Sequence, residues 1–139
     1  MPAFASLKIL VAVLVLTNSQ LLTLQTTPIE IIPAPGVGKL IVPSTVTVSW
    51  NYVAPYTNTT ASSLNTEWTP IEYNTKMANS VYGFFNSLSG SLIGSGSYVS
   101  LNVTNTGLFI AGNALNGNLT GGDPSNTMTV KVYYYIVDL

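Results

Sequence analysis

Two glutamates beside a tryptophan form the side-chain arrangement in this sequence that comes nearest to a catalytic site. Glu67 directly precedes Trp68, and Glu72 follows a few residues later. Paired carboxylates next to an aromatic ring that can stack on a sugar are typical of glycoside hydrolases. On a strand, however, an odd spacing directs the two carboxylates to opposite faces. We therefore expect both glutamates to be solvated charges, and we expect that the chain is not an enzyme.

The residue types that are missing exclude most other catalytic chemistry. The sequence contains neither cysteine nor histidine, so Ser-His-Asp and Cys-His arrangements, zinc–thiolate sites and histidine metal sites cannot form. Asp123 and Asn126 offer oxygen ligands, but a calcium ion needs about six or more of them. We expect instead a turn in which Asp123 hydrogen-bonds to local backbone. Neither a metal nor a cofactor is expected.

The scarcity of charge limits the possible partners. Charged residues make up 6% of the 139 residues, and four lysines leave a net charge of −1. So few cations cannot build the basic face that nucleic acid requires, and we expect no nucleic-acid partner. Apolar residues make up 47% of the chain and the mean hydropathy is +0.40. This composition suggests that partner subunits cover much of the surface. The alternative is a monomer whose surface consists of hydroxyl and amide side chains.

The tyrosines are candidates for a binding platform or a subunit interface. Tyr133, Tyr134 and Tyr135 are consecutive, and consecutive residues of a strand alternate between its two faces. We expect Tyr134 to lie in the core, and Tyr133 and Tyr135 to lie on an exposed or interfacial face. Tyr52 and Tyr56 could join a platform for sugars or peptides.

Three N-glycosylation sequons start at Asn58, Asn102 and Asn118. They carry little weight, because a chain rich in Asn and Thr produces such matches by chance.

The first apolar segment, residues 9–16, follows Lys8 and resembles a secretory leader as well as a buried strand. It is too short to cross a bilayer, which needs about 20 residues, and we expect no membrane association. Thr17 and Gln20 have the spacing of a capping box, which predicts a short helix at residues 18–24. A strand that leads into a capped helix belongs to a folded domain, so we expect residues 9–16 to be a fully buried strand. Cleavage after residue 19 is the alternative.

Alternating apolar residues and Gly/Pro signals divide the rest of the chain into short strands. Strands are predicted at residues 29–32, 39–42, 45–52, 67–73, 98–104, 107–111, 114–119 and 127–139. A corner is predicted at residues 34–38, turns at 105–106 and 121–126, and loops at 54–65 and 89–97. Apolar residues at residues 76–88 fit one short amphipathic helix, although a strand is also possible there.

This pattern predicts an all-β fold. Eight or nine short strands without βαβ alternation favour an antiparallel β-sandwich or a jelly-roll-like fold with one or two short helices. We expect a single domain over residues 1–139, with residues 1–7 as a possible N-terminal arm. The first and last strands are both long and apolar, so both are expected at central positions in the sheets.

Two segments resemble a known group of proteins. Residues 17–39 read TNSQLLTLQTTPIEIIPAPGVGK, and residues 120–138 read TGGDPSNTMTVKVYYYIVD. Both resemble segments of small structural proteins encoded in the virion gene clusters of tailed bacteriophages. The first segment matches the pattern T-x-x-Q-[IL]-x-x-L, which is followed by a T-P strand and then by P-A-P-G-x-G-K. The second segment is similar to the last turn and the last strand of these proteins. The residues between the two segments are unmatched.

The resemblance implies a virion structural protein, similar in role to capsid cement or decoration proteins. It implies a homo-oligomer, most often a trimer, that binds the major capsid protein on the capsid surface. The candidate interface residues are Tyr133, Tyr135, Pro33, Pro35 and Lys39. Two alternatives stay open: a small tail or fibre tip that binds a receptor or glycan, and a secreted cell-surface adhesin.

Overall fold

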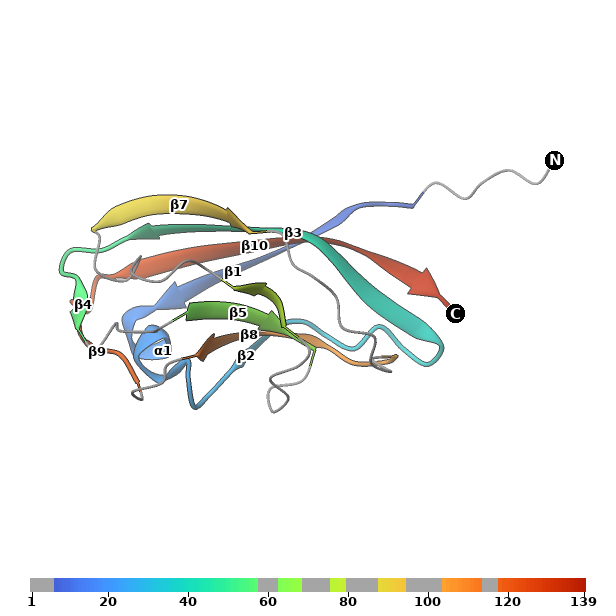
Figure 1. Cartoon of the computed structure of the whole chain (residues 1–139), viewed down its shortest axis with the longest axis horizontal. Helices are drawn as coiled ribbons and strands as arrows, with labels where there is room; N and C mark the ends of the chain where they lie inside the picture. The colour runs from blue at the N-terminus through green and yellow to red at the C-terminus, as the bar shows by residue number, and fades with distance from the viewer. Residues whose placement is uncertain (1–6, 58–62, 69–75, 80–87, 95–103, 114–117) are drawn as a thin grey trace.

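A computed structural model of the chain describes residues 7–57, 63–68, 76–79, 88–94, 104–113 and 118–139. These residues form antiparallel strands in two four-stranded sheets that lie one above the other, together with a small two-stranded ribbon (Figure 1). The expected all-β sandwich is confirmed. None of the described helical residues forms a segment with the length and hydropathy of a membrane-spanning helix.

The first sheet has the order β1-β10-β3-β7. Its strands are β1 (Leu10–Thr17), β10 (Thr127–Asp138), β3 (Lys39–Asn51) and β7 (Ser89–Gly94). The two longest strands, β3 and β10, pair along their whole lengths, so they form the centre of the sheet. Residues 45–51 and 127–132 of these strands alternate apolar and polar side chains, which is the pattern of a strand that buries one face.

The second sheet has the order β2-β8-β5-β6, and a ribbon of two short strands closes one end of the sandwich. The strands of the sheet are β2 (Ile29–Ile32), β8 (Leu108–Asn113), β5 (Ser63–Glu67) and β6 (Lys76–Asn79). The ribbon pairs β4 (Tyr56–Thr57) with β9 (Thr120–Gly121). β2 and β8 are distant in the sequence, so their pairing joins the first third of the chain to its last third.

A short helix, α1 (Asn18–Thr23), carries the chain from the first sheet to the second. Its start follows the predicted capping box. The backbone N–H of Thr17 donates to Gln20 Oε1 at 2.9 Å, which satisfies a donor that the helix itself leaves unpaired. Leu21 and Leu24 are buried on the inner side of this turn, so the helix closes the sandwich between β1 and β2 (Figure 1).

The core lies between the two sheets. Met128, Val130 and Val132 of β10 are fully buried, and Tyr134 packs partly buried against the same cluster. Val46, Val48 and Trp50 of β3 face the same interior. The second sheet contributes further apolar side chains to this cluster, among them Ile32, Leu64, Leu108 and Ile110. The predicted inward faces of both long strands are therefore confirmed.

The first strand differs from its prediction in two ways. It pairs with β10 over eight residues, so it is a strand, but it lies at the edge of the first sheet and not at its centre. It is also not fully buried: Leu16 is inaccessible, whereas Val11, Val13 and Val15 are 50–56% exposed. An edge strand of a sandwich covers the core with one face only. The sequence concealed this because both faces of β1 are apolar. The last strand, β10, is central as predicted.

Two predictions for the middle of the chain are also wrong. Lys76–Asn79 forms strand β6, the alternative that the sequence left open, and not the start of the predicted helix, because pairing with β5 takes up its backbone groups. Ser89–Gly94 forms strand β7 and not a loop, because it pairs with β3 over six residues. Long-range pairing thus overrides weak local signals in both segments. Residues 80–87, 95–97 and most of the strand predicted at 98–104 lie outside the described residues.

The loop predicted at residues 54–65 is wrong in part, because it contains β4 and most of β5, which pair with distant strands. Of the strand predicted at residues 67–73, only Glu67 lies in a described strand. Other predictions are met. β2 and β8 lie where strands were expected, and Lys39–Asn51 is one continuous strand that passes through Pro43. The register shifts beside Pro43, between Tyr133 and Tyr134 of β10, and a bulge is where a strand tolerates a proline. Residues 69–73 and 114–117 of two predicted strands lie outside the described residues, whereas Asn118 and Leu119 are not in a strand.

Candidate interface

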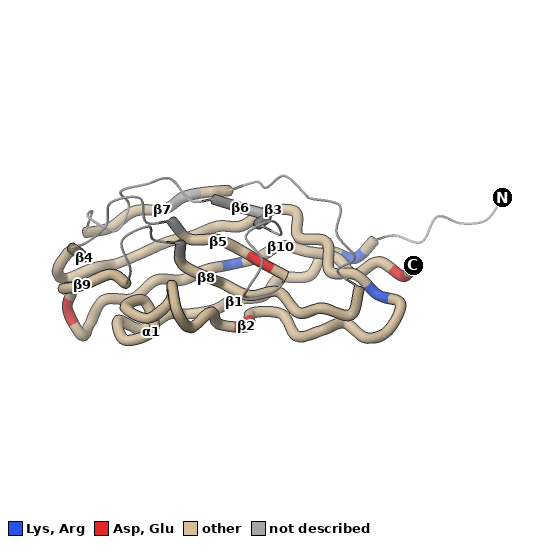
Figure 2. Tube along the Cα trace, turned by 60° about the horizontal axis from the view of Figure 1, so that its bottom comes forward, with Lys and Arg blue, Asp and Glu red and all other residues tan. Residues whose placement is uncertain are grey.

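The first sheet has one face that points away from the core. Its side chains form rows across the sheet, since paired residues share a face. One row contains Val11, Tyr133 and Thr45, and the next contains Val13, Lys131 and Thr47. We call the outward residues Val11, Val13 and Val15 of β1 the valine stripe. Figure 2 shows how few charged residues the described chain carries.

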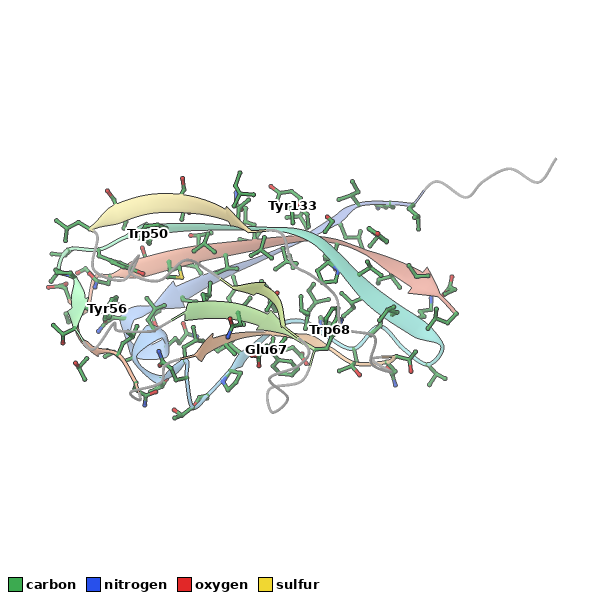
Figure 3. The ribbon with its side chains drawn as sticks, viewed as in Figure 1. Trp50, Tyr56, Glu67, Trp68 and Tyr133 are labelled. Atoms are coloured by element: carbon green, nitrogen blue, oxygen red, sulfur yellow. The ribbon has the colours of Figure 1, made fainter. Side chains whose placement is uncertain are left out.

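Tyr133 and Tyr135 lie on this outward face, beside the valine stripe. Tyr133 points away from the sandwich interior (Figure 3), in register with Val11 on one side and Thr45 on the other. Tyr135 is in register with Val42. Both side chains are partly buried by their neighbours. The arrangement combines an aromatic ring with aliphatic side chains, which suits contact with another protein surface.

The predicted corner at residues 34–38 is confirmed and is held by two distant parts of the chain. Gly36 and Gly38 have φ of +107° and +73°, in the region that favours glycine. The backbone N–H of Gly36 donates to Asn105 Oδ1 at 3.1 Å, and the Asn105 N–H donates to the Lys39 carbonyl at 2.8 Å. The N–H of Leu139 donates to the Gly38 carbonyl at 2.8 Å. The corner is therefore a fixed feature that presents Val37 at 90% exposure.

The corner brings Lys39 to the end of the first sheet. Lys39 is in register with Asp138, and the Lys39 Nζ lies 3.3 Å from Asp138 Oδ1. The Asp138 side chain is largely exposed, and the Lys39 side chain is about half exposed. Pro33 is exposed and Pro35 is partly buried on the segment between β2 and β3. The structure thus places Lys39 and Tyr135 at the same end of the β3–β10 pair, whereas Tyr133 lies nearer its middle.

The glutamate at the start of the glycosidase-like arrangement is not solvated. Glu67 is only 6% exposed and lies in β5, between β8 and β6. It is in register with Phe109 of β8, and the neighbouring strands remove it from solvent, which the sequence alone did not indicate. Trp68 is also buried, and its Nε1–H donates to the Ile41 carbonyl at 3.1 Å. Its ring is therefore a core element and not a sugar platform. Glu72 lies outside the described residues.

Tyr52 and Tyr56 also belong to the interior and not to a binding platform. They are 3% and 2% exposed, and their rings meet edge to face with centroids 5.1 Å apart. Burial raises the pKa of Tyr52, and the neighbouring Tyr56 adds to this effect. Burial also raises the pKa of Tyr56, and a hydrogen bond with Asn126 partly offsets it. The Tyr56 hydroxyl donates to Asn18 Oδ1 at 2.7 Å, which ties β4 to the start of α1.

The turn before β10 forms as predicted. Asp123 Oδ1 accepts a hydrogen bond from the Ser125 N–H at 2.8 Å, and the Asp123 carbonyl accepts one from the Asn126 N–H at 2.9 Å. Asn126 is fully buried. Its Oδ1 accepts from the Val53 N–H at 2.7 Å and its Nδ2 donates to the Ala54 carbonyl at 2.7 Å. The two residues therefore act in the architecture of the turn and of the segment after β3.

Sequence reasoning missed the valine stripe as a surface feature. The signal was present as valine at alternate positions of residues 9–16. It was masked because the intervening residues are apolar as well. A strand whose two faces are both apolar is either fully buried or has one face available to a partner, and only the strand order distinguishes the two cases.

The comparisons with known proteins bear on the fold. No family model matches the sequence, and no curated protein matches it. The fold is similar to that of a chain in a solved structure described as "Cyanophage Pam1 capsid asymmetric unit". The two chains share 18% sequence identity with a TM-score of 0.53, and the match covers 97% of this chain and 90% of that chain. At this level of identity, the likeness establishes a shared fold over nearly the whole chain.

Proposed function

We propose that this chain is a structural protein of a bacteriophage virion, and more specifically a cement or decoration protein of the capsid. The observation that carries the proposal is the match of nearly the whole fold to a chain of a cyanophage capsid asymmetric unit. It agrees with the independent resemblance of residues 17–39 and 120–138 to small phage structural proteins. In this role the chain acts without catalysis.

The surface of the described chain supports a role in assembly. A decoration protein needs faces that lock onto neighbouring subunits, and the outward face of the first sheet offers the valine stripe beside Tyr133. Exposed apolar patches of this kind mark interaction sites in soluble proteins. The fixed corner, with Val37 and Lys39 at the end of the sheet, provides a second contact region.

We further propose that the chain forms a homotrimer, bound to the major capsid protein on the outside of the head. Closed symmetric assembly buries the apolar surface that a monomer leaves in water. Tyr133, Tyr135, Pro33, Pro35 and Lys39 are the residues proposed to make these contacts.

Copy number in purified particles tests this proposal. Quantitative mass spectrometry of particles from the phage that encodes the chain should find it in many copies, in a fixed ratio to the major capsid protein. A ratio of only a few copies per particle would favour the alternative of a tail or fibre tip. Absence from the particles would refute a virion role and would leave the secreted adhesin to be tested.

A further inference from the structure

Within the described part of the chain, β1 leaves one edge of the first sheet without a paired strand, although the Thr17 N–H at its end is taken up by Gln20 Oε1. β1 pairs with β10 on one side, and among the described residues no strand is bonded to its other side. Leu10–Thr17 is eight residues long, so this edge presents backbone donors and acceptors over about 26 Å. An edge of this kind is a template for another strand.

The edge lacks the features that usually prevent such pairing. Edge strands are commonly protected by lysines, prolines or bulges, but Leu10–Thr17 contains no charged residue and no proline. Its register with β10 is uninterrupted, whereas the β10–β3, β2–β8 and β5–β6 pairs all shift. Leu7 and Ile9, which precede β1, are 60% and 65% exposed. Lys8 lies between these two residues and is also exposed, so the uncharged part of the edge is the strand itself.

We propose that this edge binds the β1 edge of a second copy of the chain, antiparallel and around a two-fold axis. The pairing joins two first sheets into one continuous eight-stranded sheet. A two-fold contact requires a self-complementary surface, and the neutral valine stripe is one. Odd-numbered residues then face odd-numbered residues across the axis, so that the stripes of both copies merge on one side of the sheet.

The position of Lys131 favours edge pairing over stacking of the two outward faces. Lys131 lies next to Val13, one strand away from the edge. In the joined sheet the two lysines are three strand spacings apart, about 14 Å, which exceeds the Debye length of about 8 Å at physiological salt. Face-to-face stacking would instead bury both lysine charges between two largely apolar faces, where salt screens them much less, and it would leave the edge unpaired.

This inference deepens the proposed function and rests on it for its setting. A protein that decorates a shell occurs at many neighbouring positions, and a two-fold contact between copies links one oligomer to the next. Its test uses the purified full-length chain. If the purified chain does not pair, the proposed virion role is unaffected. If the chain is absent from particles, the pairing of the purified chain is unaffected.

Single cysteines test the pairing directly, because the natural chain has none. Val11→Cys, Val13→Cys and Val15→Cys each place one thiol on an exposed position of the stripe. Across a strand pair, Cβ atoms lie about 4.5–5.5 Å apart, within reach of a disulfide after small shifts. Under mild oxidation of each variant and of their pairwise mixtures, at least one combination should form a covalent dimer in every register that places two residues of the stripe opposite each other.

Ile93→Cys is the matched control. Ile93 is in the same row of the first sheet as Val13, through Thr47 and Lys131, but it lies on the opposite edge strand, β7. It is 79% exposed, so its thiol is at least as accessible. Dimers from the stripe variants and not from Ile93→Cys would support the proposal. Equal dimer yields from both would show random collision and would overturn it, and so would the absence of dimers from every stripe variant.

A charge placed in the valine stripe gives a second test that does not depend on disulfide formation. Val13→Glu should weaken self-association by about two- to fivefold in sedimentation experiments, because it puts two like charges close to each other across the strand pair. Ile93→Glu should leave association unchanged. Circular dichroism checks that both variants are folded. Equal effects of the two substitutions, or cross-linking of the stripe to the major capsid protein in particles instead of to a second copy, would contradict the proposal.

Discussion

The indole ring of Trp50 lies directly against Gly90, its register partner on strand β7. A Cβ atom on Gly90 would stand 2.8 Å from Trp50 Cη2 and 3.0 Å from Cε2. Trp50 is 8% exposed and packs in the core, so the ring has little freedom to move away. The absence of a side chain at residue 90 is therefore what allows β7 to join the sheet beside β3.

Gly90→Ala should destabilise the protein. Overpacking a well-packed core typically costs about 1–3 kcal/mol, and we expect a loss in this range in chemical denaturation. Ser91→Ala is the matched control, because Ser91 is exposed on the next position of the same strand, and it should change stability little. Equal stability of Gly90→Ala and the natural protein would show that Trp50 can move aside.

The corner at residues 34–38 gives a prediction about backbone conformation alone. Gly36 has a φ of +107°, and a Cβ there would meet nothing within 4 Å. Gly36→Ala should therefore cost about 1–2 kcal/mol through strain in the left-handed region, without any clash. The control Val37→Ala changes a side chain that is 90% exposed. If Gly36→Ala unfolds at the same denaturant concentration as the control, the corner is not held in this conformation.

The buried amide of Asn126 should be essential for the segment after β3. Its side chain accepts from the Val53 N–H and donates to the Ala54 carbonyl, and each group left unpaired costs roughly 1–3 kcal/mol. Asn126→Ala should therefore lower the unfolding free energy by at least that amount. The exposed Asn51→Ala, on the adjacent strand end, should be close to neutral. A small effect of Asn126→Ala in thermal or denaturant unfolding would contradict this assignment.

Tyr52 and Tyr56 should make the protein lose stability in alkali. Their pKa values are raised in the folded state, so above the unfolded pKa of about 10 the folded chain holds protons that the unfolded chain releases. Stability is then complete below about pH 10 and falls as the pH rises further, by at most about 1.4 kcal/mol per pH unit for each tyrosine, until the folded-state pKa of that tyrosine is reached. Denaturant unfolding between neutral pH and the alkaline range measures this slope.

Two phenylalanine variants separate the contributions of these tyrosines. Among the described residues, the buried Tyr52 hydroxyl has no hydrogen-bond partner, so Tyr52→Phe should leave neutral-pH stability nearly unchanged and reduce the alkaline slope. Tyr56→Phe removes the 2.7 Å hydrogen bond to Asn18 and should cost about 1 kcal/mol at neutral pH. The opposite order of effects at neutral pH would refute the hydrogen-bond assignment.

Local chemistry explains which parts of the fold could be predicted from the sequence. The alternation of Val46, Val48 and Trp50 with polar residues identified the inward face of β3, because a half-buried strand records its burial at every second position. The capping pair Thr17 and Gln20 fixed the helix start. The turn at Asp123 follows from the tendency of aspartate to bond to nearby backbone.

Where the sequence failed, distant parts of the chain decide the structure. The composition of β7 favours a loop, and only its pairing with β3 and the space that Trp50 requires at Gly90 make it a strand. Glu67 looks like a surface charge until β8 and β6 flank it. The valine stripe could not be assigned to the interior or the surface, because position at the edge of a sheet is a property of strand order and not of residue type.

Electron cryomicroscopy of purified native particles tests the central claim most directly. If the chain is a capsid decoration protein, the map should show its β-sandwich at many equivalent positions on the outer surface of the head, with the outward face of the first sheet in contact with neighbouring subunits. A map in which every density on the head is accounted for by other proteins would contradict the account.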